Sequence, residues 1–175
     1  MSISKLSESL KDSPQFSELM GIFASQSEQH PKLQLKNIVG SGFSILLAEA
    51  FKQSDVPFLI LLEDKESAAY HLNDLEGLIG EKDVLFYPGS YRRPYHIDSL
   101  SGEETDNANV LLRSEVLNRI NSRKKPSVIV SYPEALFEKV VTKKELDKNI
   151  LKINVGEELS LDFINEVLFE YHFKR

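Results

Sequence analysis

The sequence predicts an α/β protein, a three-layer sandwich around a mainly parallel sheet, followed by the start of a second domain. Apolar stretches of strand length alternate with amphipathic stretches of helix length, as in parallel sheets with right-handed crossovers. A turn containing Gly40 and Gly42 separates the first predicted strand from the helix after it. The pattern then changes at Gly156, where a new amphipathic helix begins.

The N-terminal region, residues 1–32, is predicted to be an arm and a helix outside the main domain. Residues 1–13 are polar and serine-rich, which predicts a loosely held arm or a short helix. Residues 14–25 begin with Pro14, which suits a first helical turn. The apolar face of this helix consists of Phe16, Leu19, Met20 and Phe23.

The main α/β domain is predicted over residues 33–155. Its strand-like stretches are residues 32–39, 56–63, 83–88, 127–132 and 150–155. Residues 56–63 are nearly all apolar, which predicts a parallel strand covered on both faces.

Helical patterns follow most of these strands. They cover residues 42–51, 65–78, 107–120, 133–141 and 142–149. Asp64 is a predicted N-terminal cap, Pro133 suits a first turn, and Thr142 is a second cap. A polar loop is predicted over residues 89–102.

The turn before the first of these helices resembles a phosphate-binding loop of the form G-x-x-x-x-G-K-[ST]. In that motif backbone N–H groups cradle phosphates, the lysine balances their charge and the hydroxyl holds Mg²⁺. Aligned on Gly42 and Ser44, the chain has Asn37 in place of the first glycine and Phe43 in place of the lysine. The loop is therefore degenerate, because the charge that neutralises the phosphates is missing.

A dinucleotide-binding fingerprint, G-x-G-x-x-G/A, is a second interpretation of the same turn. Gly40 and Gly42 match it, and Glu63 or Asp64 stands where the ribose-binding acid is expected, but Ile45 replaces the third small residue. A purely structural turn is favoured. An unusual nucleotide site and another anion site at the helix N-terminus remain alternatives.

The stretch YRRPYH, residues 91–96, interleaves aromatic and basic side chains. Stacked bases and paired phosphates would be held by Tyr91, Arg92, Arg93 and Tyr95. In the alternative, which the acidic chain favours, Tyr95 packs on the domain and the arginines bond Glu103 and Glu104.

Composition narrows the function classes. The 175 residues carry a net charge of −6, which argues against strong non-specific DNA binding. The absence of cysteine excludes disulfides and thiolate metal sites and fits a cytoplasmic setting. The histidines lack ligand spacing, and no apolar stretch approaches the ~20 residues that span a bilayer. No catalytic, metal-binding or cofactor-binding residue is assigned.

Several longer stretches resemble, in order, the N-terminus of the bacterial transcription-repair coupling factors (Mfd). They are LKNIVGSGFSILLAEAF, FLILLEDKESAAYHLNDL, VLFYPGSYRRPYHIDSLS, LLRSEVLNRI, PSVIVSYPEALFEKV and INVGEELSLDFINEVLFEYHFKR. The similarity covers nearly the whole chain after about Leu33. This part of the family resembles the first domain of the excision-repair protein UvrB, whose corresponding loop is a working phosphate loop. In Mfd that loop is degenerate, and Asn37 and Phe43 depart in the same direction.

The resemblance implies a non-enzymatic scaffold and interaction module. Residues 33–155 would be the UvrB-like domain, and residues 156–175 the first helix of a UvrA-binding domain. That helix would present Leu161, Ile164, Leu168 and Tyr171 to the remaining domains. The long DNA-gripping hairpin of UvrB has no counterpart, because too few residues separate Tyr95 from Asn107.

The full-length protein would be an ATP- and Mg²⁺-dependent DNA translocase, a helicase-like hydrolase of transcription-coupled excision repair. It would release stalled RNA polymerase from DNA and recruit UvrA, mainly through residues downstream of Arg175. A nucleotide-binding enzyme domain, phosphate-loop-like or dinucleotide-binding, is the alternative.

Overall fold

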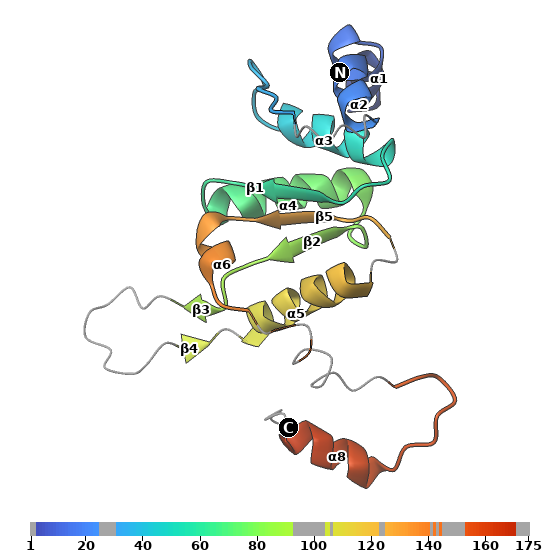
Figure 1. The fold of residues 1–175 in the computed structure, drawn as a ribbon, viewed down its shortest axis with the longest axis vertical. Coiled ribbons are helices and arrows are strands. Elements are labelled where there is room, and N and C mark those ends of the chain that lie inside the picture. The colour runs from blue at the N-terminus through green and yellow to red at the C-terminus, as the bar shows by residue number, and fades with distance from the viewer. Residues whose placement is uncertain are drawn as a thin grey trace, which may run out of the picture. The chain divides into compact units, whose positions relative to one another are not determined.

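The computed structural model describes residues 3–24, 31–92, 104–105, 107–122, 125–140, 142, 144 and 153–170. The chain divides into two compact units, residues 1–140 and 141–175, which are described separately below. Figure 1 shows the helices and strands of both units. The predicted domain boundaries at residues 32 and 155 stay predictions.

A three-stranded parallel sheet forms the centre of the first unit. Its strands are β1 (Phe58–Leu61), β5 (Val128–Ser131) and β2 (Val84–Tyr87), in the order β1-β5-β2. Figure 1 shows β5 between its two neighbours. Both pairings are parallel, which confirms the prediction of an α/β protein with a parallel sheet.

Helices cover the sheet in an arrangement compatible with three layers. The helix α4 (Lys65–Ile79) packs on β2 and β5, and α3 (Gly42–Lys52) packs on α4. The helix α5 (Asn107–Ser122), which connects β2 to β5, packs on β2. The connections β1–α4–β2 and β2–α5–β5 cross the sheet in opposite directions, so right-handed crossovers place α4 and α5 on opposite faces.

The main hydrophobic core lies between these layers. It includes side chains from all three strands and from α3, α4, α5 and α6 (Pro133–Phe137). Fully buried members are Ala48, Ala68, Leu75, Val128, Val130 and Ala135. The β-branched residues of β5 suit a central strand, because they pack well on a pleated surface that is covered on both sides.

The prediction that residues 56–63 form a strand buried on both faces is wrong. Ile60 is 5% exposed, whereas Leu59 and Leu61 are 59% and 51% exposed. The reason is the strand order, because β1 lies at the edge of the sheet and α5 packs on β2, beyond β5.

Two N-terminal helices pack on α3. They are α1 (Ile3–Lys11) and α2 (Pro14–Ala24), and a second apolar cluster joins them to α3 through Phe16, Leu19, Leu46 and Ala50. Glu49 of α3 adds an ionic contact, since its carboxylate lies 2.7 Å from Lys11 Nζ and 3.0 Å from Lys52 Nζ.

Of two further strand predictions, one is wrong and the other is tested only in part. Residues 32–39, predicted to be a strand, have no strand structure, and Leu33 and Leu35 are about half exposed there. Alternation alone does not make a strand, because its backbone groups also need a hydrogen-bonded neighbour. In the predicted strand 150–155, residues 153–155 are irregular and the preceding residues lie outside the described part.

The predicted loop over residues 89–102 contains a two-residue strand. This strand, β3 (Tyr91–Arg92), pairs antiparallel with β4 (Glu104–Thr105), so that Tyr91 is opposite Thr105 and Arg92 is opposite Glu104. The predicted helix over residues 142–149 lies almost wholly outside the described residues.

The second unit contains the helix α8 (Leu161–Glu170). Ser160 sets its start, because its Oγ accepts a hydrogen bond from the backbone N–H of Phe163 at 3.1 Å. No described helix is long and apolar enough to span a bilayer.

Candidate functional site

The glycine turn before α3 has the backbone of a tight structural turn. Asn37 and Gly40 have positive φ values of 62° and 53°, and the N–H of Gly42 donates to the carbonyl of Val39 at 3.1 Å. Only Gly40 uses the freedom of glycine in this turn, since Gly42 does not have a positive φ. A Cβ added at Gly42 would touch Ile38 Cγ2 at 3.4 Å, which is close to an ordinary contact.

Ser44, at the position of the Mg²⁺-binding hydroxyl in a phosphate loop, is committed to the protein interior. Its side chain is fully buried, and its Oγ lies 2.7 Å from Nδ1 of His71 on α4. The hydrogen bond between Ser44 and His71 leaves no exposed hydroxyl for a metal ion at this position.

Phe43, at the position of the phosphate-loop lysine, also contacts α4. Its ring packs edge to face on the His71 imidazole, with centroids 5.5 Å apart and an interplanar angle of 82°. Ser41 forms a further link, because its Oγ lies 2.9 Å from the hydroxyl of Tyr70. The side chains of Ser41, Phe43 and Ser44 thus attach the turn to α4.

The two acids of the dinucleotide-binding interpretation also have local partners. Asp64 caps α4, because its Oδ1 accepts the backbone N–H of Ser67 at 2.7 Å. That backbone hydrogen bond lowers the pKa of Asp64 below its ordinary value. Glu63 Oε1 accepts from Ser67 Oγ at 3.3 Å. The helix cap therefore explains the acidic pair without a ribose.

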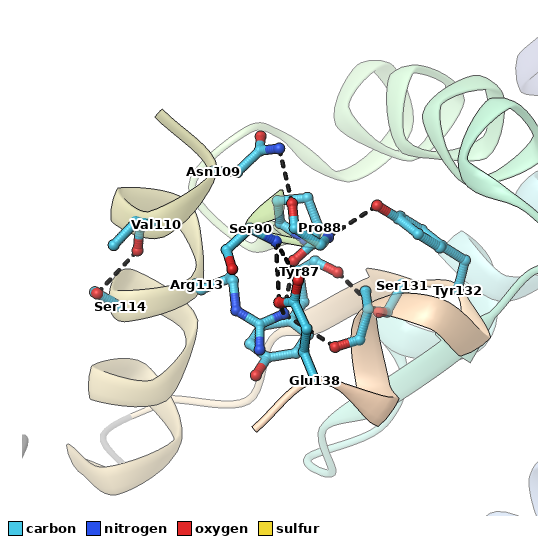
Figure 2. A network of polar contacts seen from close by, with 12 residues as sticks. Tyr87, Pro88, Ser90, Asn109, Val110, Arg113, Ser114, Ser131, Tyr132 and Glu138 are labelled. Carbon is cyan, nitrogen blue, oxygen red and sulfur yellow. Dashed lines mark hydrogen bonds and ion pairs between the residues drawn. The ribbon is translucent and has the colours of Figure 1, made fainter. Parts of the chain in front are cut away.

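A polar network lies at the carboxyl ends of β2 and β5, where Figure 2 shows it. Its centre is Arg113 of α5, which is 6% exposed. Arg113 Nη1 donates to the carbonyls of Pro88 at 2.7 Å and Ala135 at 3.0 Å, and lies 3.0 Å from Oε2 of Glu138. The guanidinium carbon is also 4.2 Å from the centre of the Tyr87 ring.

The same network holds the chain that leads into β3. The N–H of Ser90 donates to both carboxylate oxygens of Glu138, and the N–H of Gly89 donates to the Tyr132 hydroxyl at 2.8 Å. Asn109 Nδ2 donates to the carbonyl of Gly89 at 2.8 Å. The base of the β3–β4 hairpin is therefore fixed to α5, β5 and the segment after α6.

Of the four predicted aromatic and basic residues, two belong to this hairpin. Tyr91 and Arg92 belong to β3, whereas Arg93 and Tyr95 lie outside the described residues. On α8, Leu161 and Leu168 are 78% and 41% exposed. Ile164 is half-buried, and Tyr171 lies outside the described part.

The residues that organise the glycine turn and the polar network, His71 and Arg113, were not predicted from the sequence. His71 carried no signal, because only its neighbourhood in space links it to Ser44. Arg113 did carry one, since it lies four residues after Asn109 and three before the buried Val116, on the core-facing side of a helix. Within the described ranges, no group of three His, Cys, Asp or Glu side chains could hold a metal ion.

Comparisons of the chain with protein-family models, with curated proteins and with solved structures find no match. The family assignment therefore depends on the resemblance in the sequence.

Proposed function

We propose that this chain is a non-catalytic scaffold and interaction module of a transcription-repair coupling factor. In this proposal the phosphate loop survives as a turn that fixes α3 to α4. The full-length protein would be an ATP-dependent DNA translocase, with its motor downstream of residue 175. The proposed partners are the remaining domains, UvrA, RNA polymerase and DNA.

The observation that supports this proposal most is that side chains of the glycine turn contact α4. Phe43 packs on His71, and the fully buried Ser44 hydroxyl is hydrogen-bonded to the same imidazole. A triphosphate needs a lysine charge and a metal-bound hydroxyl at these two positions. Both positions serve packing between α3 and α4, so the alternative of a nucleotide-binding enzyme domain is disfavoured.

Two experiments on the whole gene product test the proposal. Sequencing the gene downstream of codon 175 should reveal translocase motor motifs in the same reading frame. In the full-length protein, Phe43→Ala should leave the rate of DNA-stimulated ATP hydrolysis unchanged, whereas substituting the lysine of the motor's phosphate loop should abolish hydrolysis. A loss of hydrolysis in Phe43→Ala, with normal folding, would place a nucleotide at this turn and contradict the proposal.

A further inference from the structure

The segment Pro88–Ser90, directly after β2, contacts one carboxylate of the chain, that of Glu138. The N–H of Ser90 donates to Oε1 and Oε2 of Glu138 at 2.8 and 2.9 Å, and Arg113 Nη1 lies 3.0 Å from Oε2 (Figure 2). A backbone N–H beside a guanidinium is the arrangement with which proteins bind phosphate groups. The Glu138 carboxylate thus occupies a built anion site, which we call the Ser90–Arg113 cradle.

The cradle has more hydrogen-bonding capacity than the Glu138 carboxylate uses. Arg113 is 6% exposed, and its Nη2 is buried without a hydrogen-bond partner among the described residues. A buried donor without an acceptor is costly, so native proteins rarely keep one without a reason. A phosphate group carries more acceptor oxygens than a carboxylate, and would supply the acceptor that Nη2 lacks.

The position of the cradle also suits a ligand. It lies at the carboxyl ends of the adjacent parallel strands β2 and β5. Ligands of open α/β sheets commonly bind outside the carboxyl ends of the strands. Glu138 itself follows the end of α6 and has extended backbone, with ψ of 140°. Its withdrawal would therefore unwind no helix and break no strand pairing.

We propose that the Ser90–Arg113 cradle is a phosphate-binding site in which Glu138 is an internal competitor. A ligand that carries a phosphate group displaces the Glu138 carboxylate and takes its hydrogen bonds from Ser90 and Arg113. The inference does not depend on the function proposed above.

Removing the competitor tests the site. Glu138→Ala should lower the thermal midpoint by roughly 10 °C, because it leaves the Arg113 charge buried without its carboxylate. Inorganic phosphate at ~50 mM should then raise the midpoint of this variant by about 5 °C more than it raises that of the wild type, at equal ionic strength. Glu134→Ala removes an exposed carboxylate of α6 and is the matched control, which should respond as the wild type does.

A second variant shows whether the guanidinium binds the added phosphate. Glu138→Ala combined with Arg113→Met should lose the extra stabilisation by phosphate. Equal phosphate responses of Glu138→Ala and the wild type would overturn the proposal and leave a purely structural ion pair. If Glu138→Ala does not fold in chloride buffer, recovery of its circular dichroism in phosphate alone supports the site, and failure in both buffers overturns it.

A labelled single-stranded oligonucleotide distinguishes two sources of the phosphate group, a nucleic-acid backbone and a small phosphate compound. Binding to Glu138→Ala about tenfold tighter than to the wild type, by fluorescence anisotropy, would assign the site to a nucleic-acid backbone. Stabilisation by inorganic phosphate without tighter oligonucleotide binding would assign it to a small phosphate compound.

Discussion

The carboxylate of Glu49 should make the free energy of unfolding of the first unit depend on pH. It is 3% exposed and lies between Lys11 and Lys52. Burial raises the pKa of Glu49, but hydrogen bonds from Lys11, Lys52 and Ser7 outweigh burial and lower the pKa from 4.5 to about 2. Because the folded-state pKa lies below the unfolded one, the ionised carboxylate stabilises the fold at pH values above the unfolded pKa. This stabilisation is lost as the pH falls through the folded-state pKa.

The magnitude follows from the size of this shift. Each pKa unit corresponds to about 1.4 kcal/mol, so the ionised Glu49 contributes up to ~3 kcal/mol to the free energy of unfolding near neutral pH. Both lysine side chains are nearly half exposed, so solvent screening lowers this value. Glu49→Gln should therefore destabilise the protein by about 1–3 kcal/mol at pH 7, and the difference from wild type should vanish between about pH 4.5 and pH 2.

Urea denaturation followed by circular dichroism, at several pH values from 7 to 2.5, measures this difference. Glu115→Gln is the matched control, because Glu115 is 58% exposed and lies 3.9 Å from Arg119 on the surface of α5. It should change the free energy of unfolding by less than ~0.5 kcal/mol at every pH. A difference between Glu49→Gln and wild type that stays constant with pH would refute the ionised contact with α1.

Three further predictions concern the turn, the C-terminal unit and the hairpin. Gly40→Ala should cost about 1 kcal/mol because its φ is positive, whereas Gly42→Ala should be nearly neutral; the reverse order in urea denaturation would contradict the observed turn. Deleting residues 157–175 should leave the thermal midpoint of the remainder nearly unchanged, because the first unit is expected to fold without α8. Unfolding of the truncated chain would contradict this expectation. Binding to duplex DNA at near-physiological salt should be weak, because an acidic chain neutralises few phosphates; sub-micromolar binding abolished by combining Arg92→Ala with Arg93→Ala would contradict this.

The sequence predicts the helices better than the edges of the sheet. Asp64 is a local signal, because its side chain caps the helix that it precedes, as predicted. The apolar run over residues 127–132 predicts a strand, and β5 lies there and is buried along its whole length. The exposure of Leu59 and Leu61 on β1 was not predictable, because it depends on the position of β1 at the edge of the sheet and on the packing of α5 on β2.

The candidate site was predicted only in part. The losses at Asn37 and Phe43 are visible in the sequence because a phosphate loop has fixed positions. The contacts of Phe43 and Ser44 with His71 are not visible in the sequence, because α3 and α4 meet only in the folded chain. The Ser90–Arg113 cradle likewise combines residues from distant parts of the sequence, and only Arg113 on a core-facing helix position signals it.

The proposed function requires that the side chains of the glycine turn are committed to α4 and that the turn binds no nucleotide. Its most direct test is a ¹⁵N–¹H correlation spectrum of the wild-type chain during a titration with Mg-ATP, followed at the amides of Gly40, Gly42, Phe43 and Ser44. These amides should show no saturable shift up to millimolar nucleotide. Saturable shifts at these four amides with a micromolar dissociation constant would show that the turn still binds phosphate, and would contradict the account.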